Sequence, residues 1–375
     1  MAISADTDVW ILVGTRPDVI KQAPLLLACR ERLGHDRVAL VGTGQHRELL
    51  EQALAHFDLE LDCNLDVMEV DQPLTEVSAS IVRGIGALLR RGAPRYVVVQ
   101  GDTSTAAMAA WAAFQQGVPV AHNEAGLRSF DLANPFPEEA NRRLISMVSS
   151  IHFAPTERAR SNLLAERVDA DGIHVTGNTG IDALLMTLER PPSNDVTEVA
   201  TAASAHGRKL VLLTAHRREN KGTPMDRWFA TLAAFLKARE DVELVYPMHL
   251  SGAGQAEAER HLRCCDRVRL VGPLDYAATC HLLAHCHFVI TDSGGIQEEA
   301  AALDVPTVVC RRTTERIEAI EAGCAVLAGT DPEPLRGALE WAYARGGERR
   351  SEIRTIFGDG HSSARIAEIL EEKLA

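Results

Sequence analysis

The sequence has no excess of positive charge. It contains 39 lysine and arginine residues against 52 aspartate and glutamate residues, which gives a formal net charge of -13 at pH 7. A negative charge of this size repels the phosphates of nucleic acids and of anionic membrane surfaces. We therefore expect neither a nucleic acid nor a membrane as a partner. A phosphate-bearing ligand would have to meet a local cluster of basic side chains.

The sequence also has no long apolar run. No stretch approaches the roughly 20 apolar residues that are needed to cross a bilayer. Residues 1–6 lack the basic and then apolar pattern of a secretory signal. From these two observations we expect a cytoplasmic protein.

The cysteines lack the spacing of a disulfide framework or a metal site. There are eight, none in a Cys-x-x-Cys motif, and most lie inside apolar stretches, as buried reduced thiols do. His281 and His285 share a helix face within the Cys- and His-rich run 280–287, but no second ligand cluster accompanies them. We expect neither disulfides nor a bound metal.

The length and the alternation of patterns predict two α/β domains. A chain of 375 residues exceeds the size at which a single hydrophobic core stops growing. Short apolar, β-rich runs alternate with helical stretches in the first half, and the same pattern restarts after residue 205. This alternation predicts two Rossmann-like domains with parallel sheets. The predicted strands are residues 10–13, 38–41, 96–99, 118–121 and 151–154, then 210–213, 242–246, 268–271, 288–291 and 307–310.

The domain boundary is expected near the polar, weakly periodic segment 190–205. We assign residues 1–185 to the N-terminal domain and residues 186–360 to the C-terminal domain. A last helix, from about Ser363 to Leu374, carries one apolar stripe and must pack against another element. Residues 361–375 are therefore candidates to pack back onto the first domain.

Basic side chains follow the first predicted strand. In open α/β sheets ligands bind beyond the carboxyl ends of the strands. Residues 14–21 combine a glycine turn with Arg16 and Lys21, both available to a phosphate group. Taken alone, the segment is equally explained as a turn with two solvated basic side chains.

Three acidic residues lie at the edges of predicted strands and helices. Asp102 follows the strand 96–99, Glu124 ends the next strand, and Glu138 opens a helix. Capping of a helix is the simplest role for Asp102 and its hydroxyl neighbours. A site that gathers several carboxylates can instead separate their pKa values and so provide both an acid and a base. This would suit proton transfer at a carbon atom.

The second half supplies groups for an anionic ligand. His216 and Arg217 directly follow a strand, although a solvated charged cluster with a packed histidine is the alternative. Residues 292–299 form a glycine turn that enters a helix, where first-turn N–H groups can hold a diphosphate. Ser293 and Gly294 would bind phosphate, and Glu299 would accept both hydroxyls of a ribose.

Taken in order, seven segments resemble the non-hydrolysing UDP-N-acetylglucosamine 2-epimerases. The resemblance runs from about Gly14 to the turn 358–360 and covers nearly the whole chain. The segments that carry it are residues 45–47, 101–103, 124–128, 137–142, 216–219, 292–299 and 313–316.

The resemblance implies a glycosyltransferase-B type of fold with the active site in the interdomain cleft. It also implies elimination of UDP across C1 and C2 to a 2-acetamidoglucal, re-addition with inversion at C2, no cofactor, a UDP-sugar as the ligand, and a homodimer. By analogy, Asp102, Glu124 and Glu138 share the acid and base steps, together with His216. Groups that bind UDP would be Arg16, Lys21, His216, Ser293, Gly294, Gly295, Glu299 and Arg316.

The sequence departs from the family at several positions. Asn123 stands where an apolar residue is common, and Ile317 replaces a usual proline, so the sugar specificity stays open. Bacterial members often carry a second, regulatory substrate site, to which Gln45, Glu138, Arg217 and His249 correspond. Glu48 and Asp71 replace a glutamine and an arginine there, and two acids would repel a diphosphate. We therefore predict weak or absent activation by the substrate.

Three other functions remain compatible with the sequence. A hydrolysing epimerase would add water to the same intermediate. A glycosyltransferase of the same fold would bind a UDP-sugar near Glu299 but would need no trio of acids. A catalytically silent UDP-sugar sensor would use the carboxylates only as caps and hydrogen-bond acceptors.

Overall fold

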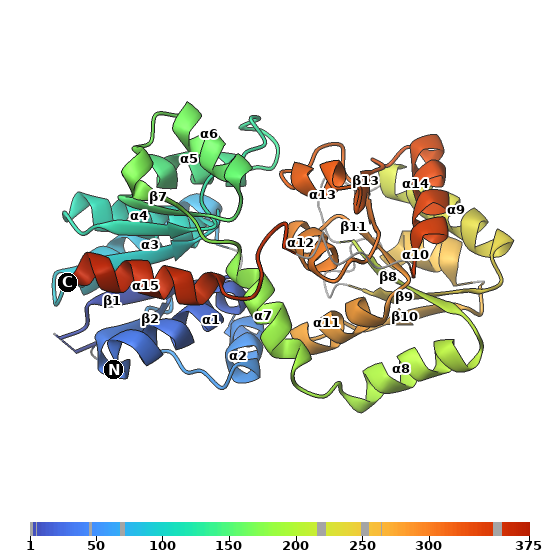
Figure 1. Cartoon of the computed structure of the whole chain (residues 1–375), viewed down its shortest axis with the longest axis horizontal. Coiled ribbons are helices and arrows are strands. Elements are labelled where there is room, and N and C mark those ends of the chain that lie inside the picture. Colours follow the sequence, from blue (N-terminus) through green and yellow to red (C-terminus); the bar gives the residue numbers. More distant parts are fainter. Residues whose placement is uncertain are drawn as a thin grey trace. The chain divides into compact units, whose positions relative to one another are not determined.

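The computed structural model describes residues 3–4, 6–44, 47–67, 72–215, 223–248, 255–263, 265–347 and 355–375. The chain divides into two compact units (Figure 1). The first consists of residues 1–183 and 358–375, and the second of residues 184–357. Each unit contains one parallel sheet with helices, which confirms the predicted α/β class. No helix among the residues described is long and apolar enough to cross a membrane.

The sheet of the first unit has seven strands in the part of the chain described, in the order β3-β2-β1-β4-β5-β6-β7. All pairs are parallel, and the central strand β1 is in register with β2 from Val9↔Val38 to Val13↔Gly42. Because the order changes direction beside β1, the carboxyl ends of β1 and β4 flank a topological switch point. The strands are β1 (Val9–Val13), β2 (Val38–Gly42), β3 (Cys63–Asn64), β4 (Tyr96–Gln100), β5 (Val120–Asn123), β6 (Ile151–Ala154) and β7 (Ile173–Val175).

Helices cover the sheet of the first unit, and alternate strand residues face them. Trp10 and Leu12 of β1 pack with Val97 and Val99 of β4 against α3, α4 and α5. Helix α1 contacts α2 and the C-terminal helix α15. The helices are α1 (Arg16–Leu33), α2 (Arg47–His56), α3 (Leu74–Leu89), α4 (Ser104–Gln115), α5 (Glu138–Val148), α6 (Glu157–Ala165), α7 (Thr179–Leu188) and α15 (Ser362–Leu374), with 3-10 helices at His35–Arg37 and Ala170–Gly172.

The C-terminal helix belongs to the first unit. An ion pair joins α15 to α1: Nε of Arg32 on α1 lies 2.6 Å from Oε2 of Glu371 on α15. At the other end, the backbone N–H of Ser363 donates to Asp182 Oδ2 at 2.6 Å. These two contacts fix both ends of a helix whose apolar stripe, which includes Ile366 and Leu370, is buried.

The second unit repeats the architecture with a parallel sheet in the order β10-β9-β8-β11-β12-β13. Val211 and Leu213 face one core with α9, α10 and α14, whereas Leu210 and Leu212 face another with α8, α11 and α12. The elements are α8 (Asn194–Ala205), β8 (Lys209–Thr214), α9 (Thr223–Ala238), β9 (Val242–Pro247), α10 (Gln255–Leu262), β10 (Val268–Val271), α11 (Tyr276–His285), β11 (Phe288–Thr291), α12 (Gly294–Ala302), β12 (Thr307–Val309), α13 (Ile317–Glu321), β13 (Ala325–Leu327) and α14 (Pro332–Arg345).

Two predictions about local structure need correction. The strand expected at residues 118–121 is β5, which begins at Val120 and ends at Asn123, because Pro119 has no N–H to donate to the ladder. His122 and Asn123 are therefore strand residues. The polar segment near the expected boundary contains the helix α8 from Asn194 onward, with Val196 and Ala203 buried.

Candidate active site

The turn after β1 holds Arg16 and Lys21 at the start of α1. The backbone N–H groups of Gly14 and Thr15 donate to Asp18 Oδ2 at 3.0 and 2.9 Å. Asp18 is buried, and this burial raises its pKa to about 6. Gly14 admits no side chain, since a Cβ would lie 2.1 Å from Thr105 Oγ1. Arg16 is the first residue of α1 and is half-buried.

Glu124 is held against a cation. It directly follows β5 in the left-handed region, with φ of 64°. Lys21 Nζ and Gln100 Nε2 both donate to its Oε2 at 2.5 Å. The two side chains of the ion pair are 15% and 5% exposed. The structure thus brings together two residues that the sequence analysis assigned separately, one to the phosphate and one to acid-base chemistry.

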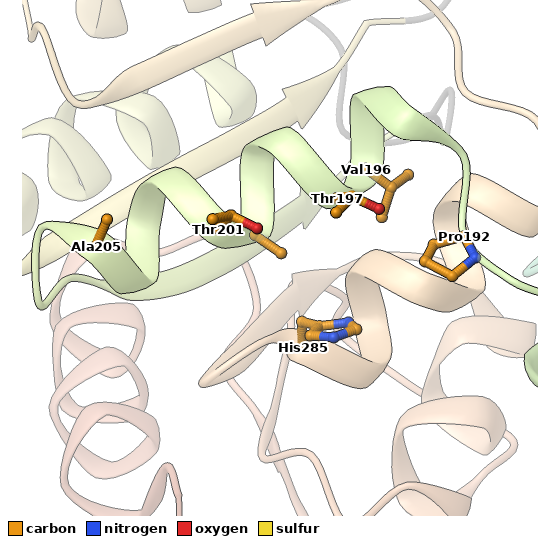
Figure 2. Close-up of a pocket in the computed structure, with 7 residues that line it drawn as sticks. Pro192, Val196, Thr197, Thr201, Ala205 and His285 are labelled. Atoms are coloured by element: carbon orange, nitrogen blue, oxygen red, sulfur yellow. The ribbon is translucent and has the colours of Figure 1, made fainter.

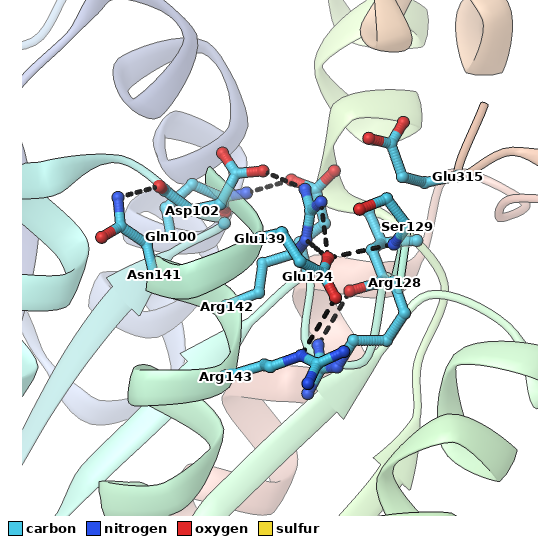
Figure 3. A network of polar contacts seen from close by, with 12 residues as sticks. Gln100, Asp102, Glu124, Arg128, Ser129, Glu139, Asn141, Arg142, Arg143 and Glu315 are labelled. Atoms are coloured by element: carbon cyan, nitrogen blue, oxygen red, sulfur yellow. Dashed lines mark hydrogen bonds and ion pairs between the residues drawn. The ribbon is translucent and has the colours of Figure 1, made fainter. Parts of the chain in front are cut away.

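Asp102 is held against a second cation (Figure 3). It lies in the turn between β4 and α4, and its Oδ2 accepts from Arg142 Nη1 at 2.6 Å. The backbone carbonyl of Asp102 accepts from Asn141 Nδ2 at 2.8 Å. The cap of α4 is Thr103, whose Oγ1 accepts from the N–H of Ala106 at 3.1 Å. Of the residues predicted to cap the helix, Thr103 does so, whereas the Asp102 carboxylate pairs with an arginine.

Arg142 is itself held by Glu139, a residue that the sequence analysis did not single out. The Glu139 side chain is fully buried and accepts from Arg142 Nη2 at 2.8 Å and from the N–H of Ser129 at 3.0 Å. Burial alone would raise the pKa of Glu139, but hydrogen bonds from Ser129, Arg142 and Arg143 outweigh it, so the pKa is lowered. The spacing of three residues between Glu139 and Arg142 in α5 was the available signal.

Glu138 opens α5, as predicted from the sequence. Its side chain is partly buried, and Oε2 has no hydrogen-bond partner among the residues described. Asp102 and Glu124 thus have cationic partners, whereas this oxygen of Glu138 has no partner within the described ranges.

His122 supports the turn that carries Asp102. Its Nε2 donates to the carbonyl oxygen of Gly101 at 2.7 Å, and the imidazole is completely buried. Burial lowers the pKa of His122 to about 3, so the ring is neutral at physiological pH. Gly101, which precedes Asp102 in this turn, has φ of 61°, a left-handed conformation that glycine adopts without strain.

In the second unit, Arg316 lies against the start of α12. A Cβ at Gly294 would lie 2.9 Å from Arg316 Cζ, so the guanidinium contacts the first residue of the helix. Arg316 is 7% exposed, and its Nε donates to Glu298 Oε1 at 2.7 Å. Ser293 is the N-cap residue, and a Cβ at Gly295 would meet no atom within 4 Å. The structure thus gathers a helix N-terminus and a cation, the two features that favour a phosphate.

Glu299 lies one turn into the same helix. It is 8% exposed, and its Oε1 accepts from the hydroxyl of Tyr276 on α11 at 3.2 Å. Burial raises the pKa of Tyr276 well above its ordinary value, so the phenol stays protonated and donates. Tyr276 was not predicted from the sequence, because it is distant from Glu299 along the chain.

Four predicted residues, Gln45, His216, Arg217 and His249, lie outside the residues described. Within the described part, no group of three or more His, Cys, Asp or Glu side chains could hold a metal ion. Two histidines of the run 280–287 contact backbone carbonyls: His285 Nδ1 lies 2.7 Å from the carbonyl oxygen of His281, and His287 Nε2 lies 3.0 Å from that of Tyr343.

A cavity in the second unit contains none of the predicted site residues (Figure 2). It has a volume of about 410 Å³ and lies between α8 and α11. Its lining is mainly apolar, with Val196 and Ala205 from α8 and His285 as the titratable side chain. Nothing in this lining resembles the groups gathered around Asp102, Glu124 or Arg316.

Comparison with known proteins decides the family. The family model described as UDP-N-acetylglucosamine 2-epimerase matches residues 30–371. The chain belongs to the UDP-N-acetylglucosamine 2-epimerase family. Among relatives of this family, a probable UDP-N-acetylglucosamine 2-epimerase of Ralstonia nicotianae is 42% identical over 98% of this chain and 99% of its own. The UDP-N-acetylglucosamine 2-epimerase of Bacillus subtilis is 40% identical, over 96% and 94%.

Solved structures of the family agree in fold. The putative UDP-N-acetylglucosamine 2-epimerase of Listeria monocytogenes has a TM-score of 0.91 at 40% identity and covers 99% of this chain and 97% of its own. The Neisseria meningitidis UDP-GlcNAc 2-epimerase, solved bound to UDP-GlcNAc, has a TM-score of 0.88 at 36% identity, over 98% and 100%. The glycosyltransferase-B type of fold that the resemblance implied is therefore confirmed.

Proposed function

We propose that this protein interconverts UDP-N-acetylglucosamine and UDP-N-acetylmannosamine without net hydrolysis. The reaction would eliminate UDP across C1 and C2, leave a 2-acetamidoglucal, and add UDP back with inversion at C2. Family membership supports the substrate. The observation that carries the chemistry is the set of carboxylates in the first unit, with Asp102 and Glu124 each paired to its own cation and Glu138 Oε2 without a hydrogen-bond partner in the part of the chain described.

The elimination needs both proton transfer and charge stabilisation. A carboxylate takes the C2 proton, the C1–O bond breaks, its electron pair leaves with the diphosphate, and a C1–C2 double bond forms. No carbonyl activates the C2 proton, so departure of UDP must develop positive character at C1. The carboxylates Asp102, Glu124 and Glu138 would share the proton transfers with His216. Because no hydride is transferred, the reaction has no need of a nicotinamide cofactor.

The diphosphate would be held by cations and helix N–H groups that act as the leaving group gains charge. Arg16, Lys21 and His216 would neutralise it, and Ser293, Gly294 and Gly295 would contact it at the start of α12. Arg316, fixed by Glu298, supports this assignment. Glu299, oriented by Tyr276, would accept the ribose hydroxyls.

Product analysis tests the proposal. The protein is incubated with UDP-N-acetylglucosamine in the absence of NAD, and the products are separated by anion exchange. Formation of UDP-N-acetylmannosamine with no accumulation of UDP would support it. Free N-acetylmannosamine and UDP in step with turnover would instead identify a hydrolysing enzyme. Binding without turnover would identify a sensor, and turnover only with an added acceptor a transferase.

The resemblance also leads us to propose a homodimer. Analytical ultracentrifugation at micromolar concentration tests this, and a mass of 40.7 kDa, that of one chain, would contradict it.

A further inference from the structure

Three hydrogen bonds form a closed ring through Glu124. Its backbone N–H donates to Asn123 Oδ1 at 3.0 Å. Asn123 Nδ2 donates to Gln100 Oε1 at 2.8 Å, and Gln100 Nε2 returns to Glu124 Oε2 at 2.5 Å. Asn123 and Gln100 are 0% and 3% exposed, so water does not compete for these groups. The side chain of Gln100 lies beside that of Glu124 in Figure 3.

The direction of this ring is fixed at its start. A backbone N–H only donates, so the atom of Asn123 that faces it must be the amide oxygen. The nitrogen of Asn123 then faces Gln100, whose oxygen must accept, and the Gln100 nitrogen is left to face the carboxylate. Asn123 Nδ2 also donates to Thr179 Oγ1 at 3.0 Å, which uses its second N–H. Asn123 therefore selects one of the two amide orientations of Gln100.

The same asparagine supports a strained part of the backbone. Glu124 has φ of 64°, a conformation that is unfavourable for a side chain of this type. The hydrogen bond from its N–H to Asn123 stabilises this backbone conformation and so fixes the position from which the Glu124 side chain projects. An apolar side chain at position 123 would provide neither this acceptor nor the donor to Gln100.

We propose that Asn123 is a positioning residue that, through Gln100, orients the Glu124 carboxylate for the reaction. The inference rests on the proposed function, in which Glu124 takes part in proton transfer at C2. Without Asn123, the Gln100 amide can turn its oxygen toward Glu124, where it would repel the carboxylate.

A double-mutant cycle tests the proposal with Asn123→Leu and Gln100→Met, both close in size to the native side chains. Exchange of the C2 proton in deuterated water and steady-state kinetics are measured for each variant. We expect each single substitution to lower kcat by roughly 10- to 100-fold, as for loss of a hydrogen bond to a charged group, with KM changed less than about 3-fold. Because Asn123 acts through Gln100, the double variant should be no slower than the slower single variant.

A matched control is Gln116→Met, which removes one glutamine amide that donates to the carbonyl of Gly86 at 2.9 Å. It should leave kcat unchanged. Should Asn123→Leu fail to fold, Asn123→Asp keeps the acceptor for the Glu124 N–H but cannot donate to Gln100, so the same loss of kcat is expected. Wild-type kinetics in Asn123→Leu or Asn123→Asp, or losses that multiply in the double variant, would overturn the role of Asn123. Absence of C2 exchange in the wild-type protein would instead overturn the proposed function.

Discussion

Arg142 joins Asp102 to Glu139 from a completely enclosed position. Its Nη1 donates to Asp102 Oδ2 at 2.6 Å, while Nη2 and Nε donate to Glu139 Oε2 at 2.8 and 3.0 Å. A planar guanidinium reaches the two carboxylates with separate N–H groups held in a rigid fork, whereas a lysine ammonium is a single compact donor that lacks this geometry. The geometry of α5 thus determines where a proposed catalytic carboxylate lies after β4.

Replacement of Arg142 by lysine should therefore impair turnover while keeping the charge. We expect Arg142→Lys to lower kcat by roughly 10- to 100-fold, since a hydrogen bond to a charged group contributes about 1.5–3 kcal/mol. Steady-state kinetics and circular dichroism measure the effect and the fold. Arg160→Lys, at a half-exposed arginine on α6, is the matched control and should behave as wild type. Wild-type kcat in Arg142→Lys would show that Asp102 does not depend on this contact.

A methyl group at Gly294 should weaken the binding of UDP. The new Cβ would lie 2.9 Å from Arg316 Cζ, so the guanidinium must shift away from the start of α12. We expect Gly294→Ala to raise the Kd for UDP roughly 10-fold or more, measured by isothermal titration calorimetry. Gly337→Ala on α14, where a Cβ meets no atom within 4 Å, controls for the substitution itself. An unchanged Kd in Gly294→Ala would exclude Arg316 from the UDP site.

Removal of the Asp18 charge should stabilise the protein at neutral pH. Burial raises the pKa of Asp18 from its ordinary 3.8 to about 6, which corresponds to about 3 kcal/mol. Because the folded pKa is the higher one, the protonated group favours folding below pH 4, and this advantage is lost as the pH rises to 6. Asp18→Asn keeps an acceptor for Gly14 and Thr15 but has no charge. Its melting temperature should exceed that of wild type at pH 7.5 and match it near pH 4.

The control for this prediction is Asp36→Asn, at a side chain that is completely exposed. It should leave the melting temperature within about 1 °C of wild type at both pH values, as surface substitutions usually do. A stability difference for Asp18→Asn that does not depend on pH would contradict the account of its burial.

Activation by the substrate should be weak or absent. Glu48 is exposed on α2, and Asp71 lies outside the residues described. Two acids at the position of a second diphosphate would repel it. We expect the rate with UDP-N-acetylmannosamine to follow a hyperbolic curve. A sigmoidal curve that becomes hyperbolic on addition of trace UDP-N-acetylglucosamine would contradict this prediction.

The fold could be predicted from the sequence wherever the strands were long enough to show a pattern. The buried strands β1, β4 and β8 each give an apolar run of four or more residues within their bounds. The strands β3, β7 and β13 have only two or three residues and were missed, because so short a run has no recognisable period. The equally short β12 was predicted because its apolar run continues to Cys310. Tertiary pairing with longer neighbours, rather than local propensity, forms these strands.

The candidate site, too, could be predicted only in part from the sequence. Asp102 and Glu124 were predicted because each directly follows an apolar strand. Their ion pairs were not predicted, although Lys21 itself was assigned to the site, since Arg142 and Lys21 reach the two carboxylates across 40 and 103 residues of chain. Such contacts arise only when the sheet brings its carboxyl ends together. Tyr276 was missed for the same reason, being fixed to Glu299 by the packing of α11 near α12.

Exchange of the C2 proton tests the central claim most directly. Proton NMR would follow UDP-N-acetylglucosamine in deuterated water with wild-type protein and with Glu124→Gln, with no NAD added. We expect the wild type to exchange the C2 proton as the anomeric signal of UDP-N-acetylmannosamine grows. Glu124→Gln should still bind UDP but lose both signals. Absence of exchange in the wild type, or full exchange in Glu124→Gln, would contradict proton transfer at C2 by this carboxylate.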